Sequence, residues 1–371
     1  MRRRLWGIGA IVGMALVLSL SGALAGLLQS PAYFPTSLHA TRQGKITAYS
    51  AENGGAELIT GIPMSELPCL KCHPGTYADG TEVDPAAYEP GCRDCHAQTG
   101  DTPPQEQCLK CHSRQRLEMR LGYRDVHREA GMSCLDCHNQ ADLHGDGTRY
   151  ASFLEPGAVH ISCEDCHLDG EAPAPPASAP HSLHGERLDC TACHTQSVVT
   201  CFNCHFESIA EAHVKRMYSW VSGYQLLLNR RLEEGKTKVY AGTFMAVTYQ
   251  DKSFYVLAPY RAHTIQKEGR GCDECHANDN LRQYEESGTM TLTRWDPERK
   301  GILMPRGVIP VPPNWQEALL IDFVTYTGDL AAPTDPEKWE FLKRGADVMQ
   351  LYYAEPLTEE QMQKLRTPMG Q

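Results

Sequence analysis

The chain has 371 residues, of which 46 are acidic and 35 basic, and its formal net charge at neutral pH is −11. This length is enough for one large or two ordinary globular domains. An acidic surface repels nucleic acid and attracts basic proteins, so the charge excludes nucleic acid as a partner and is compatible with a basic protein.

The N-terminal segment has the features of an export sequence. Arg2, Arg3 and Arg4 precede an apolar run over residues 5–28, which ends close to two small residues, Ala23 and Ala25. This order is typical of a secretory signal peptide, but the run also exceeds the roughly 20 residues that span a bilayer. Residues 1–28 are therefore interpreted as a signal peptide or an N-terminal membrane anchor. Both interpretations predict an exported chain, periplasmic or extracellular, and leave anchoring to the inner membrane open.

All 16 cysteines belong to eight copies of the pattern Cys-x-x-Cys-His. The cysteine pairs, in chain order, are Cys69 and Cys72, Cys92 and Cys95, Cys108 and Cys111, Cys134 and Cys137, Cys163 and Cys166, Cys190 and Cys193, Cys201 and Cys204, and Cys272 and Cys275. The histidines that follow them are His73, His96, His112, His138, His167, His194, His205 and His276.

The pattern is a signature of covalent haem attachment. Two cysteines three residues apart on a helical turn reach the two vinyl groups of one porphyrin, and the next histidine then faces the iron. Zinc sites and redox dithiols also use Cys-x-x-Cys, but they do not need a histidine after every pair. The sequence therefore predicts eight covalently bound haem c groups, each with its iron held by a motif histidine.

Seven motifs lie between residues 69 and 205, in segments rich in glycine and proline and poor in regular hydrophobic periodicity. Such segments predict short helices and irregular loops packed on haem. We expect a five-haem lobe over residues 29–170 and a three-haem lobe over 181–276. The proline-rich stretch between them is either a linker or a surface excursion.

The remaining segments predict regular structure. A helix is expected over 209–231, where apolar residues recur every three or four positions, and a hairpin over 244–258. Further strands are expected at 289–295 and 320–326, inside a haem-free C-terminal cap over 277–371. The fold class is thus a multihaem cytochrome c of haem-packed short helices and irregular loops, with a small mixed α+β C-terminal region.

Eight histidines lie outside the motifs, as many as there are motifs: His39, His127, His144, His160, His181, His184, His213 and His263. A second imidazole on each iron leaves an electron carrier, whereas an open position admits a substrate. The equal numbers favour histidine on both sides of every iron. An exposed histidine, or one bonded to a haem propionate, is the alternative, and His39, His181 and His184 fit the ligand role least well.

The motifs resemble those of multihaem c-type cytochromes of the octahaem class. The block from Cys190 to Thr195 and from Cys201 to Phe206 is similar to blocks in the octahaem tetrathionate reductase family. That resemblance implies that a lysine from elsewhere in the chain can ligate one iron. No motif here ends in lysine, which favours electron transfer over catalysis, and no catalytic residue is assigned.

The function expected from the sequence is electron relay in the periplasm or at the cell surface. The partners would be a quinol-oxidising donor and a terminal reductase or extracellular acceptor, with self-assembly also open. The alternative is a reductase or oxidoreductase of small nitrogen or sulfur compounds, acting at one open or lysine-ligated haem. Binding of exogenous ligands to an iron separates the two hypotheses.

Overall fold

The structure is a computed structural model and describes residues 31–98, 100–232, 236–332 and 335–367. The predicted signal peptide or anchor at 1–28 lies outside the described residues. Over the described part of the chain, no helix combines the length and apolar character needed to cross a membrane. The chain forms two compact units, Met1–Gly44 with Leu135–Ile161 and Lys45–Cys134 with Ser162–Gln371.

The smaller unit is built from short helices. The 3₁₀-helix η1 (Pro31–Thr36) is followed by α2 (Leu38–Thr41), and α8 (Gln140–His144) packs against both. The side chain of Asn139 caps α8 by accepting hydrogen bonds from the first backbone amides of the helix.

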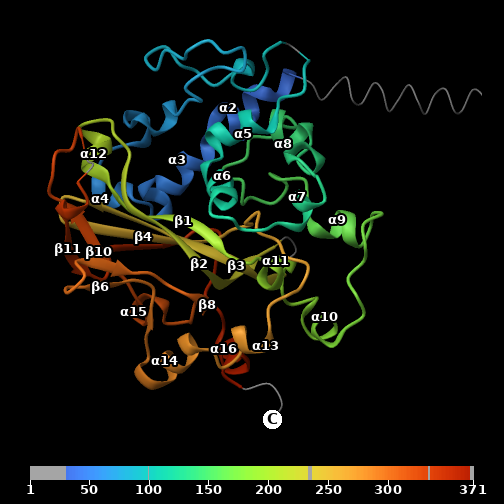
Figure 1. Cartoon of the computed structure of the whole chain (residues 1–371), viewed down its shortest axis with the longest axis vertical. Helices are drawn as coiled ribbons and strands as arrows, with labels where there is room; N and C mark the ends of the chain where they lie inside the picture. Colours follow the sequence, from blue (N-terminus) through green and yellow to red (C-terminus); the bar gives the residue numbers. More distant parts are fainter. Residues whose placement is uncertain (1–30, 99, 233–235, 333–334, 368–371) are drawn as a thin grey trace, which may run out of the picture. The chain divides into compact units, whose positions relative to one another are not determined.

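The larger unit contains a six-stranded mixed sheet with strand order β12-β4-β3-β1-β2-β8 (Figure 1). The strands are β1 (Val198–His205), β2 (Arg216–Arg231), β3 (Thr237–Tyr249), β4 (Lys252–Pro259), β8 (Gly307–Pro310) and β12 (Val348–Leu351). The pairs β1–β2, β2–β3 and β3–β4 are antiparallel, whereas β2–β8 and β4–β12 are parallel. The sheet begins at the seventh motif, so it is larger and starts earlier than the small C-terminal region that the sequence predicted.

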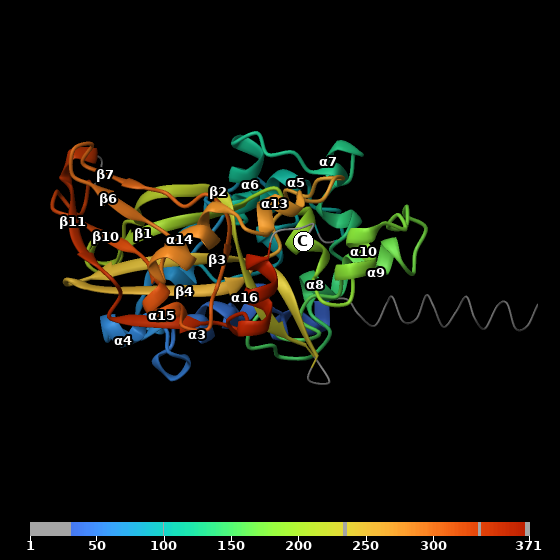
Figure 2. The same cartoon turned by 90° about the horizontal axis from the view of Figure 1, so that it is seen from below.

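Two apolar clusters cover the faces of this sheet. Phe202, Tyr224 and Phe244 belong to one cluster, together with residues of the C-terminal segment. The other cluster contains Cys201 and Cys204 and packs against α4 (Glu57–Thr60). Figures 1 and 2 show α4 on one side of the sheet and α14 (Asp279–Ser287) and α15 (Trp315–Ala318) on the other.

The predicted helix over 209–231 is wrong, because this segment forms the end of α12 (Phe206–Ala210) and then β2. Val198 of β1 pairs with Tyr224 and Thr200 with Val221, so β2 carries an extra residue at this point. Gly223 has φ 81° at this bulge, which shifts the two-residue alternation of the strand by one position. Apolar residues on the two sides of the bulge are therefore three positions apart, as they would be on a helix.

The predicted hairpin is confirmed by β3 and β4, which pair across Gln250 and Asp251, both in the left-handed conformation that tight hairpin turns use. The expected strands at 289–295 and 320–326 correspond to short pairs. These pairs are β5 (Met290–Thr291) with β9 (Leu319–Leu320), β6 (Arg294–Asp296) with β7 (Gly301–Leu303), and β10 (Asp322–Tyr326) with β11 (Trp339–Arg344).

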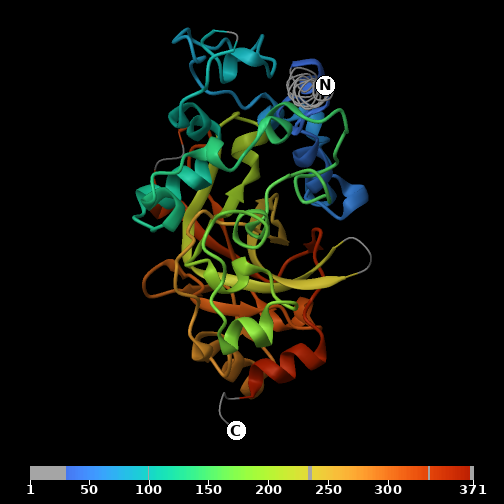
Figure 3. The same ribbon diagram turned by 90° about the vertical axis from the view of Figure 1, so that its right-hand side faces the viewer.

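Seven of the eight motifs form short helical turns, as the sequence predicted. These turns are η4 (Pro68–Lys71), η5 (Cys92–Asp94), α5 (Gln105–Cys111), η6 (Cys134–Asp136), α9 (Cys163–His167), α11 (Cys190–His194) and α13 (Cys272–Cys275). Together with α10 (Ala179–His184), the helices α9 and α11 lie beyond one end of the sheet in Figures 1 and 2. Figure 3 shows the same green segment beside the orange and red helices of the C-terminal region.

Candidate haem-binding centres

The helical turns position the motif side chains. In α9, Ser162 and Asp165 form a reciprocal capping box, and in α11 the Asp189 carboxylate accepts a hydrogen bond from the Thr191 amide. Fourteen of the sixteen cysteines are exposed or half-buried; the exceptions are Cys201 and Cys204. The thiols of the other seven pairs are therefore at least partly accessible and can carry a bulky group.

The motif histidines of four helical turns share one arrangement. Nδ1 lies 2.6 Å from the Asp101 carbonyl in His96, 2.8 Å from the Pro173 carbonyl in His167, 3.0 Å from the Gln266 carbonyl in His194 and 3.0 Å from the Lys364 carbonyl in His276. A carbonyl oxygen only accepts, so Nδ1 carries the proton and donates it. The Nε2 lone pair of each ring is then available to a metal ion.

Two histidines outside the motifs show the same arrangement. Nδ1 of His181 lies 3.0 Å from the Pro176 carbonyl, and Nδ1 of His184 lies 3.0 Å from the Pro180 carbonyl. Backbone carbonyls in the proline-rich stretch thus orient both rings. These two residues seemed the weakest ligand candidates in the sequence, and the structure prepares both of them for metal binding.

Three motif histidines face a histidine from outside the motifs. The ring centres are 6.1 Å apart for His127 and His167, 6.1 Å for His181 and His194, and 6.3 Å for His184 and His276. Two imidazoles that each bind one metal ion from opposite sides, at about 2 Å per nitrogen, have ring centres roughly 6 Å apart. The residues present therefore fit an iron atom between the two rings of each pair.

In the smaller unit, one buried carboxylate holds two imidazoles. Asp142 accepts from Nδ1 of His138 at 3.1 Å and from Nδ1 of His160 at 2.9 Å. The hydrogen bonds from these rings help keep the pKa of Asp142 below its usual value, although burial alone would raise it. Sequence reasoning missed Asp142, although its position four residues after His138 places it within reach.

Other predicted residues are placed differently. Gly75 donates its amide to Nδ1 of His73 at 3.1 Å, which is the reverse of the arrangement in the four turns described above. His263 donates its backbone amide to the buried carboxylate of Glu118 at 3.2 Å. His213 lies exposed in a left-handed backbone conformation, and no imidazole among the described residues packs against it.

The seventh motif differs from the other seven. Cys201, Cys204 and His205 lie on strand β1 and are all buried. Burial raises the pKa of the Cys204 thiol to about 12. The ring of His205 contacts Tyr326 and Trp339. Its Nε2, the atom that would bind iron, lies 3.3 Å from a carboxylate oxygen of Glu207. In this conformation the residues of the motif do not fit a haem.

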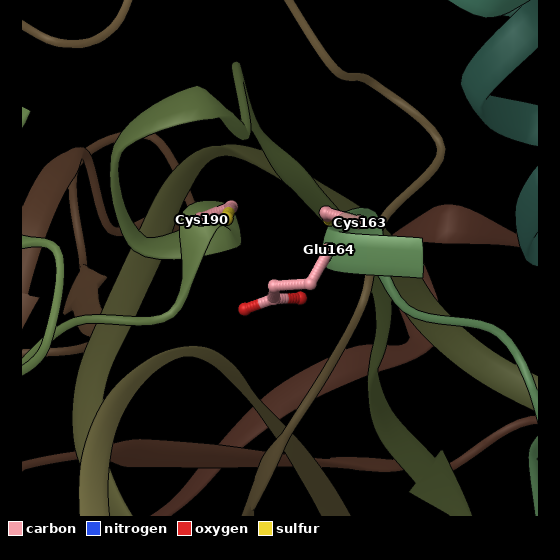
Figure 4. Close-up of side chains that lie close together, drawn as sticks. All are labelled: Cys163, Glu164 and Cys190. Atoms are coloured by element: carbon pink, nitrogen blue, oxygen red, sulfur yellow. The ribbon is translucent and has the colours of Figure 1, made fainter. Parts of the chain in front are cut away.

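Thiols of different motifs lie close together. The Sγ atoms of Cys163 and Cys190 and a carboxylate oxygen of Glu164 all lie within 4.8 Å of one another. Figure 4 shows Cys163 and Glu164 on α9 facing Cys190 on α11. Such a group could hold a metal ion, but both cysteines belong to Cys-x-x-Cys-His motifs and would be used in thioether bonds. We therefore interpret the group as two neighbouring haem attachment points.

Comparison with known proteins identifies the kind of protein. A family model described as cytochrome c3 matches residues 126–206, which include four motifs. The multihaem cytochrome MtrA of Shewanella baltica is 27% identical over 120 residues, which cover 28% of this chain and 32% of the relative. These findings support a multihaem c-type cytochrome. No solved structure matches the chain.

The two comparisons support covalently bound haem c in this chain. The chain spans about a third of the length of the curated relative that it matches. The expected short helices and mixed sheet are present in the structure.

Proposed function

We propose that the chain is an exported octahaem cytochrome that relays electrons in the periplasm or at the cell surface. The observation that carries this proposal is the pairing of imidazoles at 6.1–6.3 Å. Five of the six rings are fixed through Nδ1 to backbone carbonyls, and the sixth, His127, has its Nδ1 3.5 Å from Asp125. Each haem, when bound, supplies an iron that gains and loses one electron. With histidine on both faces no position is left for a substrate, so electron transfer is the remaining chemistry.

The residues of this chain then act by binding and orienting. The thiols anchor each porphyrin, the paired histidines close the iron, and the carbonyls of Pro173, Gln266 and Lys364 keep the motif rings in the metal-binding tautomer. Hydrogen bonds and burial around each ring set its reduction potential. We propose His39, His144, His160, His213 and His263 as the other distal ligands, on the basis of the equal numbers of motifs and spare histidines.

Titration with cyanide or nitrite tests this function. The oxidised protein as purified should show no rapid change of its Soret band, because histidine occupies both axial positions of every iron. Rapid stoichiometric binding would overturn the relay and favour the reductase. A variant that opens one iron, such as His181→Ala, is the positive control and should bind one equivalent.

The location and partners follow from the same proposal. A quinol-oxidising donor and a terminal reductase or extracellular acceptor would exchange electrons with the chain, and residues 1–28 would direct export or anchor it. The five-haem lobe at 29–170, the three-haem lobe at 181–276 and the cap at 277–371 remain the proposed functional division. The name of the relative MtrA, a multihaem cytochrome, supports a redox role for the chain.

The octahaem count depends on the seventh motif. Because Cys201 and Cys204 are buried on β1, haem must attach to them before the sheet closes, and the segment must differ from its conformation here. Intact mass of the purified protein should show eight haems, and a Cys201→Ala/Cys204→Ala variant should show seven. A mass with seven haems in the natural sequence would contradict the count and leave the other motifs unaffected.

One observation favours the alternative, a reductase of small nitrogen or sulfur compounds at an open or lysine-ligated haem. Among the described residues, the ring of His205 packs against Tyr326 and Trp339 and against no imidazole. An open iron should therefore be sought at this motif. If the natural protein binds cyanide and the Cys201→Ala/Cys204→Ala variant does not, the reductase replaces the relay as the proposed function.

A further inference from the structure

We propose that the haems of the fifth, sixth and eighth motifs form one branch of the electron path, in that order. These motifs are Cys163–His167, Cys190–His194 and Cys272–His276. We further propose that α10 joins the last two haems by giving His181 to one iron and His184 to the other. This inference rests on the proposed haem attachment, and it assigns ligands and neighbours that the sequence left open.

The helix α10 places two histidines on the same side. His181 and His184 are three residues apart, so their side chains leave the same side of the helix, with Cβ atoms about 5–6 Å apart. The ring of His181 lies parallel to that of His194, with 9° between their planes, whereas His184 faces His276. One helical turn therefore supplies ligands to two different motifs, and the two irons must be neighbours.

The segments of the sixth and eighth motifs are also in direct contact. The segment that leads into the eighth motif is bonded to the sixth, because Gln266 donates its amide to the His194 carbonyl at 2.9 Å and Arg270 donates its amide to the Cys193 carbonyl at 3.0 Å. Gly269 of the same segment lies so close to the sixth motif that an added Cβ would be 3.7 Å from Cβ of Cys193. The sixth motif therefore packs against the segment that leads into the eighth, independently of α10.

The fifth motif lies beside the sixth. The Sγ atoms of Cys163 and Cys190 lie within 4.8 Å of each other (Figure 4). A hydrogen bond to Cys190, together with burial, raises the pKa of the Cys163 thiol. The fifth motif histidine faces His127 on α7 (Val126–Glu129), so this end of the branch is joined to the segment between the third and fourth motifs.

The branch leaves out the seventh motif, although that motif follows the sixth in the chain. The buried thiols of the seventh motif pack in the cluster on the sheet face, against which Cys69 of the first motif also packs. The order of haems in space therefore differs from the order of motifs in the sequence. The eighth haem forms one end of the branch, where Cys272 is exposed and His276 is fixed by Lys364 of the C-terminal helix α16 (Glu359–Arg366).

Ligand variants in two haem-deletion backgrounds test this assignment. The backgrounds are Cys190→Ala/Cys193→Ala, which lacks the sixth haem, and Cys272→Ala/Cys275→Ala, which lacks the eighth. Intact mass verifies the loss of one haem in each. The readout is the number of high-spin, cyanide-binding irons per chain, measured by electron paramagnetic resonance and Soret titration.

In the natural sequence, His181→Ala and His184→Ala should each create one cyanide-binding iron. His184→Ala should create no cyanide-binding iron when the eighth haem is absent, and His181→Ala should create none when the sixth haem is absent. His184→Ala without the sixth haem, and His181→Ala without the eighth, should each still create one. The reversed pattern, or an extra iron in every background, would overturn the assignment. Cyanide binding by the unmodified chain would instead contradict the proposed function.

A second measurement applies where a haem-deletion variant does not fold. Methionine in place of an axial histidine raises the potential of its haem. His181→Met and His184→Met should each move one haem to higher potential in a redox titration, and the double variant should move two. Leu183→Met, which places a methionine at an exposed position of α10 between the two histidines, is the matched control and should move none. If only one haem shifts in the double variant, the proposal that α10 serves two irons is wrong.

Discussion

Asp142 is a side chain that binds two of the proposed iron ligands, His138 and His160. Its carboxylate accepts hydrogen bonds from Nδ1 of His138 and of His160, and also from the backbone amide of His160 at 2.7 Å. A carboxylate that accepts from Nδ1 makes the imidazole a stronger electron donor at Nε2. The motif rings of His167, His194 and His276 bond instead to neutral backbone carbonyls, so an iron held by His138 should favour the oxidised state more strongly than theirs.

The variant Asp142→Asn tests this effect. An amide oxygen is neutral and accepts more weakly, so the haem served by His138 should move to higher reduction potential, while haem content and the other potentials stay unchanged. Spectroelectrochemical titration measures the shift. Asp84→Asn is the control, because the Asp84 carboxylate is exposed and accepts from the Ala86 amide. Equal potentials in the two variants would show that Asp142 does not tune the iron.

Among the strands, β1 is tied to its neighbours around the seventh motif by the side chain of a single residue, Asn203. Asn203 has φ 54° and is fully buried. Its side-chain amide donates to the Val324 carbonyl at 2.7 Å and to Thr248 Oγ1 at 3.1 Å, and its oxygen accepts from the Val324 amide at 2.9 Å. These bonds hold a left-handed residue inside a strand and tie β1 to β10 and β3.

In the Cys201→Ala/Cys204→Ala background, where no haem is attached to β1, Asn203→Ala should lower the free energy of unfolding by about 2–4 kcal/mol, because both backbone groups of Val324 lose a buried partner. Chemical denaturation followed by far-ultraviolet circular dichroism measures this loss. Asn139→Ala, which removes an exposed helix cap, is the matched control and should cost about 1 kcal/mol. A loss no greater than that of the control would contradict the role of Asn203.

The sequence predicts elements that depend on neighbouring residues better than elements that depend on contacts between distant segments. The hairpin of β3 and β4 was predictable because local turn residues separate two apolar runs. The helix predicted over 209–231 was wrong because the bulge at Gly223 depends on pairing with β1, which is a contact between distant segments. The motif thiols are local and could be predicted, whereas the pairing of His184 with His276 joins residues far apart in the chain.

At the scale of the whole molecule, the chain buries its apolar side chains unevenly. The sheet and its C-terminal covering have large buried clusters of their own. Among the described residues between 92 and 194, the buried apolar side chains are Leu154, Ala158 and Ala192. A few side chains of this kind cannot offset the entropy of ordering such a long segment, so we propose that haem supplies its core.

Removal of haem should therefore affect the two regions differently. In a haem-free preparation, backbone amides of β2, β3 and β4 should stay protected in hydrogen exchange, whereas amides between 92 and 194 should exchange almost as fast as in an unfolded chain. Mass spectrometry of peptides from the exchanged protein gives both values in one experiment. Protection between 92 and 194 without haem would contradict the proposal that haem forms the core there.

Low-temperature electron paramagnetic resonance of the fully oxidised protein shows whether histidine closes both faces of the irons. We expect low-spin signals of bis-histidine haems from every iron and no high-spin signal. A high-spin signal that disappears on addition of cyanide would reveal an open iron and contradict the electron relay.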